Sequence, residues 1–211
     1  MKLKWLFERL RSKSLFFSVF YVLQVPFATF ALLSSKKIHP AYDLSFVKKL
    51  RLGLRMFLNT LRIETGSTYK AHLVMALKLF ELPPPSEVPG DVVECGTWKG
   101  GSAANLSIVC KIVGRKLIVC DSFEGLPKPL PNTSDSLEYF KGDYCGTLPE
   151  VKENIARCGE IDVCEFVEGW FEKTLPGLDL PIVLAWVDVD LESSLETCVS
   201  NLWPLLSERG L

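Results

Sequence analysis

The chain has 211 residues, of which 48% are hydrophobic and 23% charged, a composition that suits one α/β domain with an extension. Its seven cysteines form no C-x-x-C pair, which argues against a zinc site and indicates reduced, packed thiols in a cytoplasmic protein. The net charge of −1 hides a division: residues 1–62 carry twelve Lys and Arg against two acidic residues, +10, and the remainder carries −11. The two parts are therefore suited to different surroundings.

Residues 14–35 contain no charged side chain, and basic residues flank them on both sides. Roughly twenty apolar residues can cross a bilayer, but Gln24 and Pro26 interrupt this stretch. A single span with the rest of the chain in the cytoplasm would also oppose the positive-inside tendency. Three interpretations are open: a membrane-embedded or interfacial anchor, a buried helical extension or homo-oligomer interface, and a signal peptide without a good cleavage site.

Residues 44–63 place apolar side chains at helical spacing with Lys and Arg between them. Such a helix can lie on anionic lipid, so that residues 1–62 would associate with a membrane, or its basic side chains can form a solvated face. Nucleic acid is not an expected partner, because no aromatic stacking platform accompanies the charges. Ser67 or Thr68 then caps a helix to about Leu82, and prolines 83–85 end it. We place the boundary there, between an extension, 1–82, and a domain, 88–211.

The stretch from Asp91 to Ser102 predicts a buried strand, a tight turn and the start of a helix over about 101–113. Glycines in the turn permit positive φ and let a ligand approach the backbone and the helix amides. Their G-x-x-x-G-G spacing differs from the G-x-G-x-x-G of dinucleotide sites. The acidic residue that ends the strand, Glu94, suits a cationic amino acid rather than a phosphate. The alternative is a glycine-rich turn that serves only packing.

Residues 116–121 predict a second strand that ends at Asp121, whose carboxylate offers two acceptors to ribose hydroxyls. A helix-capping role is the alternative. Residues 122–146 form a long connection, which we interpret as a mobile lid near the acceptor, and Thr147 caps the next helix. Residues 162–167 predict the third strand. The aromatic pair Trp170 and Phe171 follows it, either against an adenine ring or in the core.

The fourth predicted strand, 181–187, leads directly into Asp188 and Asp190. Two carboxylates one residue apart at a strand end lie close enough to repel each other, and a divalent cation resolves that repulsion. Mg²⁺ often takes only one or two carboxylates plus water. The alternative is that one of the two caps a helix that begins near Ser193.

These motifs, taken together, resemble the macrocin O-methyltransferase (TylF-like) family of class I S-adenosylmethionine (SAM)-dependent methyltransferases. The resemblance covers about residues 88–211 and implies a Rossmann-like sheet and SAM- and Mg²⁺-dependent methylation of a hydroxyl on a sugar or glycosylated natural product. It implies Asp188 as a metal ligand and Asp190 as the general base. The implied cofactor-binding residues are Glu94, Gly96, Thr97, Gly100, Gly101, Ser102, Asp121, Ser122, Gly169, Trp170 and Asp188.

The chain departs from the family pattern at two places. Val189 stands where the family usually has glycine, and the chain stops at Leu211, where a fifth strand followed by two acidic metal ligands is expected. We therefore expect a sheet truncated after strand four, with that strand an unpaired edge and the isolated chain poorly stable. Neither His39 nor His72 lies near the motifs, so a histidine base is not expected.

Two other functions are alternatives to methyl transfer. A NAD(P)-dependent oxidoreductase would also use a glycine turn and an acidic ribose ligand, but the glycine spacing and the pair Asp188 and Asp190 disfavour it. A non-catalytic or truncated methyltransferase-like protein at a membrane is the other.

Overall fold

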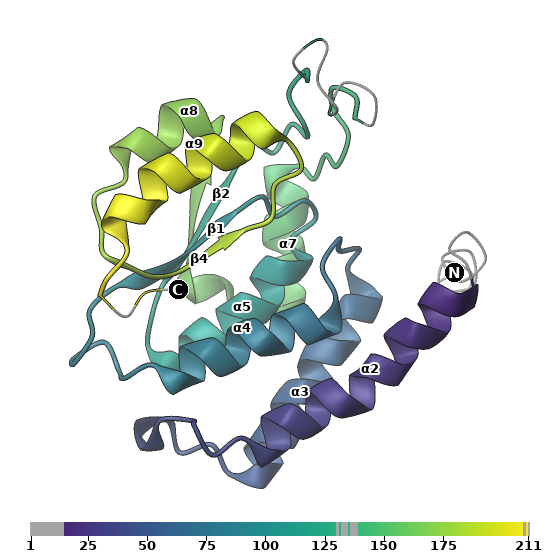
Figure 1. Ribbon diagram of the computed structural model, residues 1–211, viewed down its shortest axis with the longest axis vertical. Coiled ribbons are helices and arrows are strands. Elements are labelled where there is room, and N and C mark those ends of the chain that lie inside the picture. Colours follow the sequence, from purple (N-terminus) through teal and green to yellow (C-terminus); the bar gives the residue numbers. More distant parts are fainter. Residues whose placement is uncertain (1–14, 130, 132–134, 136–138, 209, 211) are drawn as a thin grey trace.

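The computed structural model describes residues 15–129, 131, 135, 139–208 and 210. Figure 1 shows a parallel sheet with helices on both faces and a group of amino-terminal helices packed against one side. The amino-terminal helices are α2 (Leu15–Ser34), α3 (Phe46–Arg62) and α4 (Tyr69–Glu81), with a 3₁₀ turn at Pro40–Tyr42. The strands are β1 (Asp91–Cys95), β2 (Leu117–Asp121), β3 (Cys164–Glu168) and β4 (Ile182–Val187). The helices between and after them are α5 (Gly101–Val113), α7 (Leu148–Cys158), α8 (Phe171–Thr174) and α9 (Glu192–Leu202).

The four strands are parallel and lie in the order β3-β2-β1-β4. The chain therefore moves outward from β1 in one direction through β2 and β3, and then returns to place β4 on the other side of β1. In open α/β sheets the ligand crevice lies outside the carboxyl ends of the strands at such a switch point. The topology confirms the predicted Rossmann-like α/β fold and identifies the edge where a site is expected.

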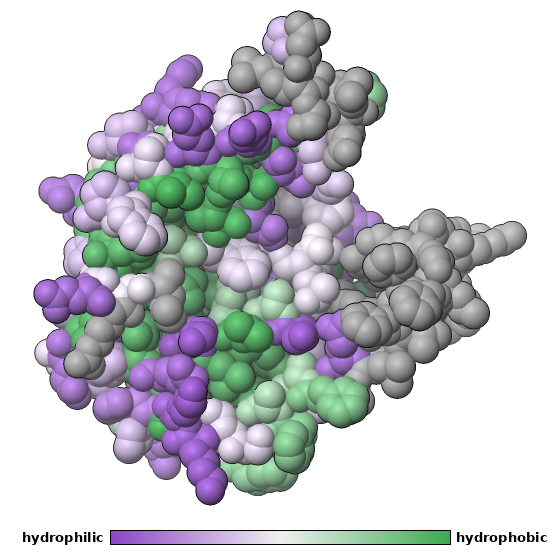
Figure 2. Space-filling view, in the orientation of Figure 1, coloured by the Kyte–Doolittle hydropathy of each residue, from purple (hydrophilic) through white to green (hydrophobic). Residues whose placement is uncertain are grey.

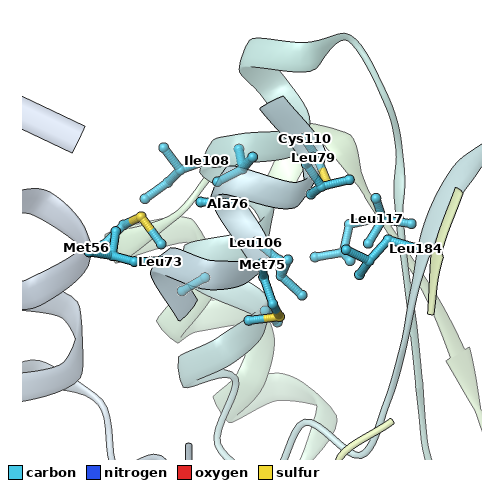
Figure 3. Close-up of a cluster of buried hydrophobic side chains, with 14 of the residues drawn as sticks. Met56, Leu73, Met75, Ala76, Leu79, Leu106, Ile108, Cys110, Leu117 and Leu184 are labelled. Atoms are coloured by element: carbon cyan, nitrogen blue, oxygen red, sulfur yellow. The ribbon is translucent and has the colours of Figure 1, made fainter. Parts of the chain in front are cut away.

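In β1 and β2, apolar side chains of successive residues belong alternately to two hydrophobic clusters, one on each face of the sheet. In β4, Val183 and Leu184 both belong to the first cluster, where the pairing of β4 with β1 is irregular. Val92 packs with α4, α5 and the extension, whereas Val93 packs with the α9 side. Figure 3 shows part of the larger cluster, in which Met56 of α3 and Leu73 of α4 lie together at one end, Leu117 and Leu184 of the strands lie at the other, and Leu106 of α5 lies between them. The extension and the sheet thus share one core.

Helix α2 packs against the rest of the chain through its carboxyl-terminal half. Leu32 is fully buried, and the hydroxyl of Thr29 lies 3.0 Å from that of Tyr69 on α4. Phe27 and Phe30 are exposed on the other side. Among the described residues there is no helix long and apolar enough to cross a membrane; residues 1–14 lie outside them. This packing agrees with the interpretation of the segment as a buried helical extension. Its contact with lipid stays a prediction.

The predicted helix caps Thr68 and Thr147 are confirmed, and Ser45, which was not predicted as a cap, has the same role. Ser45 begins α3, Thr68 begins α4 and Thr147 begins α7, each by accepting a hydrogen bond from a backbone N–H three positions on. Helix α4 ends at Glu81, before the prolines. The linker behind it is held by the buried Arg115, whose guanidinium donates to the carbonyl oxygens of Pro83, Val88 and Gly90.

A buried polar network joins α3 and α4 of the extension to α5 of the domain. Asn105 Nδ2 lies 2.8 Å from His72 Nδ1, and Asn59 Nδ2 donates to Asn105 Oδ1 at 3.0 Å. Burial lowers the pKa of His72 to about 4, so this imidazole is neutral near pH 7. Because each partner comes from a different helix, the network constrains how the extension sits on the domain.

Three of the four strands differ from the predictions by one or two residues at their ends. The second strand begins at Leu117 and the fourth at Ile182, and the third runs over Cys164–Glu168 because residues 161–163 form a 3₁₀ turn. The expectation that β4 is an unpaired edge is wrong at one position. Leu206 forms an isolated parallel bridge with Ile182, and Ser207 N donates to Ile182 O at 2.8 Å.

Candidate cofactor site

A cavity of about 700 Å³ opens at the carboxyl ends of the strands. That volume is within the usual range for small-molecule and cofactor sites. Every strand contributes residues to its wall, from its last residue or from the loop and helix start that follow it. These are Gly96, Thr97, Trp98 and Ser102 after β1, Asp121 and Ser122 after β2, Gly169, Trp170, Phe171 and Glu172 after β3, and Asp188, Val189, Asp190 and Ser194 after β4.

The turn after β1 has one glycine that faces the site. Gly96 has φ +83°, and a Cβ there would lie 2.4 Å from the carbonyl oxygen of Asp188. Only glycine permits this approach, which brings the β1 turn against the end of β4. Gly100 and Gly101 face protein instead, because added Cβ atoms would meet Val151 at 3.1 Å and Thr65 at 2.8 Å. Close packing accounts for these two, and their contact with a cofactor stays a prediction.

Asp121 is held across the ends of β1 and β2. Its Oδ2 accepts from Thr97 N and its Oδ1 from Phe123 N, each at 2.8 Å. Both donors are loop amides, so the carboxylate fixes two turns and does not cap a helix. A carboxylate has about four lone-pair positions, so two used positions leave acceptors for hydroxyls at the cavity wall. Burial raises the pKa of Asp121, and the backbone hydrogen bonds oppose that rise.

Glu94 lies under the turn, fully buried, and is not among the residues that line the cavity. Thr97 Oγ1 donates to its Oε2 at 3.4 Å, whereas its Oε1 has no hydrogen-bond partner among the described residues. Burial raises the pKa of Glu94 to about 8, and the charges of Asp188 and Asp121 add to that effect. The carboxyl is therefore mostly protonated at neutral pH.

Asp188 and Asp190 both lie at the cavity, directly after β4. Asp188 Oδ2 accepts from Ser67 Oγ at 2.5 Å. Burial, and then the charge of Asp188, raises the pKa of Asp190. The alternative that one of them caps the next helix is wrong, because α9 has Leu191 at its N-cap position without a side-chain cap. Glu192 N donates instead to Asp135 Oδ2 at 3.0 Å.

The described residues do not form a complete metal site. Among them there is no group of three or more His, Cys, Asp or Glu side chains placed to hold an ion. Asp188 and Asp190 are two carboxylates of the kind that Mg²⁺ takes together with water. These two residues do not form a complete cage, and a cation would need further donors.

The loop after β3 brings an aromatic residue to the cavity. Gly169 has φ +140°, and its N–H donates to Asp121 O at 2.9 Å, which joins this loop to the end of β2. Trp170 lines the cavity and precedes α8. Phe171 also lines it but packs against the hydrophobic cluster on the α9 side. Of the pair, Phe171 thus has the packing role that was the alternative interpretation.

Several residues of the cavity wall were not predicted as site residues, among them Trp98, Glu172 and Ser194. Glu64, Thr65 and Gly66 come from the loop between α3 and α4, and Glu64 forms an ion pair with Lys99 beside the β1 turn. No sequence signal marks this contact, because it joins positions about 35 residues apart. The connection 122–146, predicted to lie near the acceptor, lines the cavity through Gly125, Leu126, Pro127 and Tyr144; its mobility stays a prediction.

Two curated proteins are similar to this chain. The 8-demethyl-8-(2,3-dimethoxy-alpha-L-rhamnosyl)-tetracenomycin-C 4'-O-methyltransferase of Streptomyces olivaceus is 35% identical over 133 residues, which are 58% of this chain and 51% of that protein. The mycinamicin III 3''-O-methyltransferase of Micromonospora griseorubida is 30% identical over 168 residues, 70% of this chain and 66% of that protein. The chain thus spans about half the length of the first and about two-thirds of the second.

Structural similarity agrees on the fold. The solved structure of the O-methyltransferase NovP matches with a TM-score of 0.52 at 19% sequence identity, over 89% of this chain and 80% of that one. This confirms the predicted class I methyltransferase fold. The family model described as Macrocin-O-methyltransferase (TylF) matches residues 80–211, which is more than half of the chain and includes every strand-end motif described above. The chain therefore belongs to the macrocin O-methyltransferase family.

Proposed function

We propose that the protein transfers a methyl group from SAM to a hydroxyl of a sugar on a glycosylated natural product. The two similar curated proteins are named as O-methyltransferases, and the name of the first includes a rhamnosyl group. The observation that carries the proposal is the placement of Asp121. Its carboxylate is fixed at the cavity by Thr97 N and Phe123 N with acceptor positions left over, as a ribose diol requires.

The rest of the cavity suits the other parts of SAM. Trp170 follows β3, beside the end of β2, and offers an aromatic wall to the adenine. The methionine part would lie at Gly96, Thr97 and Ser102, near the amino terminus of α5 and above the buried carboxyl of Glu94. A sulfonium and an ammonium group are both cations, so the acidic residues at the strand ends favour them over a phosphate.

Asp190 is the proposed base. Burial and the neighbouring Asp188 raise its pKa, which makes it a better proton acceptor than a solvated aspartate. The acceptor hydroxyl would donate its proton to Asp190 as its oxygen approaches the methyl carbon along the C–S axis. Positioning and proton removal are the two contributions assigned to this chain's own residues.

Dependence on Mg²⁺ is part of the proposal and rests on the family resemblance. Asp188 would be one ligand, and the described residues do not supply a complete set. Isothermal titration calorimetry with MgCl₂ in the presence of S-adenosylhomocysteine (SAH) tests this. We expect Asp188→Asn to weaken the binding of Mg²⁺, and unchanged binding would remove Asp188 from the metal site.

Calorimetry with SAM and SAH tests the cofactor assignment. Asp121→Asn keeps the size of the side chain but removes its charge and one acceptor, and we expect about tenfold weaker binding. Asp162→Asn is the control, because Asp162 is exposed and pairs with Lys111 far from the cavity. No binding of either ligand by the unchanged chain would refute the proposal.

Two alternatives have distinct outcomes. Binding of NADH, seen as energy transfer from tryptophan to the nicotinamide, would support an oxidoreductase. Binding of SAM without transfer of a radiolabelled methyl group to rhamnosylated acceptors would support a non-catalytic methyltransferase-like protein. Oligomeric state stays a prediction, for which light scattering is the measurement.

A further inference from the structure

Two aromatic residues with unusual backbone conformations meet at the cavity. Trp98 has φ +48° and Tyr144 has φ +54°, a region that bulky residues rarely adopt. Their ring centroids lie 5.4 Å apart at an interplanar angle of 88°, an edge-to-face contact. Both residues line the cavity, although they come from different loops 46 positions apart.

The surrounding backbone holds this conformation from two sides. Trp98 follows Thr97, whose N–H is bound to Asp121, and the carbonyl of Trp98 lies so close to Gly146 that a Cβ there would meet it at 2.0 Å. Tyr144 follows Asp143, whose carbonyl accepts from Leu126 N at 2.8 Å. The β1 turn and the long connection therefore lock each other in place.

Core packing does not account for the arrangement. Neither aromatic residue belongs to either hydrophobic cluster, and Tyr144 is 47% exposed. Residues held in sparsely populated backbone regions cluster at ligand-binding sites, where the surrounding structure maintains them. The edge-to-face pair thus places apolar ring surface at the cavity wall, where a ligand can contact it.

We propose that Trp98 and Tyr144 form the acceptor subsite, an aromatic platform that binds the C–H face of a pyranose ring. This inference rests on the proposed function and specifies which residues recognise the sugar. A pyranose has an apolar face whose C–H groups pack against the electron-rich face of an aromatic ring. Its hydroxyls would meet the acidic side chains of the same cavity, Asp190 and Glu172. Apolar contact with a few polar groups is the usual composition of such sites.

Lys99 helps to fix the platform. Its Nζ lies 5.6 Å from the centroid of the Trp98 ring and also pairs with Glu64. A cation within about 6 Å of an indole is attracted to the ring. The loop between α3 and α4 thus acts on the orientation of Trp98 through Lys99, and Lys99 is a positioning residue for the subsite.

Saturation-transfer NMR tests the platform. The probe is methyl α-L-rhamnopyranoside, added to the chain in saturating SAH, and we expect the ring C–H protons to receive saturation. Trp98→Ala and Tyr144→Ala should each lower the affinity for the probe about tenfold. Trp203→Ala is the matched control, since Trp203 is exposed outside the cavity. SAH binding is measured by calorimetry for each variant.

A second variant separates recognition from folding. Trp98→Gly relieves the positive φ, so we expect an unchanged or higher melting temperature, retained SAH binding and loss of saturation transfer. Saturation transfer that persists in both alanine variants overturns the proposal that Trp98 and Tyr144 bind the sugar. An absence of saturation transfer in an unchanged chain that binds SAH overturns it as well. Failure of the unchanged chain to bind SAH would instead overturn the proposed function itself.

Discussion

Ser67 Oγ donates a hydrogen bond of 2.5 Å to Asp188 Oδ2, across 121 positions of sequence. Ser67 belongs to the loop between α3 and α4, and Asp188 follows the last strand of the sheet. The ion pair between Glu64 and Lys99 joins the same loop to the turn after β1. The amino-terminal extension is therefore a wall of the site, in addition to a layer of the core.

Removing the hydroxyl of Ser67 should weaken the binding of SAM. Ser67→Ala removes the side-chain hydroxyl that donates to the carboxylate of Asp188, so this carboxylate is less well oriented. We expect about threefold to tenfold weaker binding by calorimetry. Ser67→Thr, which keeps the hydroxyl, serves as the control. Equal affinities for all three proteins would show that this hydrogen bond has no part in the site.

Glu94 should make the protein less stable as the pH rises. Its pKa is about 8 in the folded chain, against an ordinary value of 4.5. Below pH 4.5 the carboxyl is protonated in both states; between 4.5 and 8 only the unfolded state loses the proton, so the free energy of unfolding falls over that range. Glu94→Gln should abolish this slope and stabilise the chain at pH 7.5 by roughly 1–3 kcal/mol.

Urea denaturation at pH 5 and pH 7.5 measures this change. Glu165→Gln is the control, because Glu165 is exposed and pairs with Lys116. A larger pH dependence in the Glu94→Gln variant than in the unchanged chain would contradict the assignment. The same experiment tests the expectation of poor stability, since a cooperative transition at ordinary temperature would show that the 211-residue chain folds stably alone.

Binding of SAM should release a proton near neutral pH. A cation at the cavity lowers the pKa of Glu94, so the carboxyl ionises when SAM binds. Affinity should then increase with pH up to about pH 8, by at most about tenfold per unit. Calorimetry in buffers with different ionisation enthalpies counts the protons. A pH-independent affinity, or the same slope in Glu94→Gln, would exclude this coupling.

Loss of the Asn105 side chain, which joins the extension to α5, should lower the stability of the fold. Asn105→Ala removes the side-chain amide that His72 Nδ1 and Asn59 Nδ2 now contact. We expect a loss of about 1–3 kcal/mol in the free energy of unfolding. Asn201→Ala is the comparison, because Asn201 donates within its own helix to Thr197 O. Equal losses of unfolding free energy in the two variants would show that the network stabilises the fold no more than a hydrogen bond within one helix does.

The outer face of the extension should bind anionic lipid. Figure 2 shows apolar side chains at the lower edge of the molecule, where α2 and α3 lie. Phe27 and Phe30 of α2 and Phe46 of α3 are exposed, and the described residues 15–63 carry seven Lys and Arg against one Asp. Two such faces would repel each other, which favours a negatively charged surface over a second copy.

Vesicle flotation measures this association. We expect binding to vesicles that contain phosphatidylserine, weaker binding at high salt, and none to neutral vesicles. Phe30→Asp should reduce it, whereas Val74→Asp on α4 should not. A protein that stays unbound under all conditions would leave packing against the domain as the only role of α2 and α3.

The sequence alone determined the elements, the topology class and the family. Apolar periodicity, the caps Thr68 and Thr147 and the prolines after Leu82 are local signals, so helix starts and ends were predicted closely. Acidic residues at strand ends indicated the cavity edge, because parallel strands end at the same edge of a sheet. The strand boundaries were less accurate, since the 3₁₀ turn at residues 161–163 depends on packing.

Only the tertiary structure decided which residues face the cavity. Gly100 and Gly101 face Val151 and Thr65, Glu94 lies beneath the wall, and Ser67 reaches Asp188. Each of these depends on contacts between segments that are far apart in the chain. A sequence motif specifies residue types and spacing along one segment, whereas the direction of a side chain depends on what the rest of the fold packs against it.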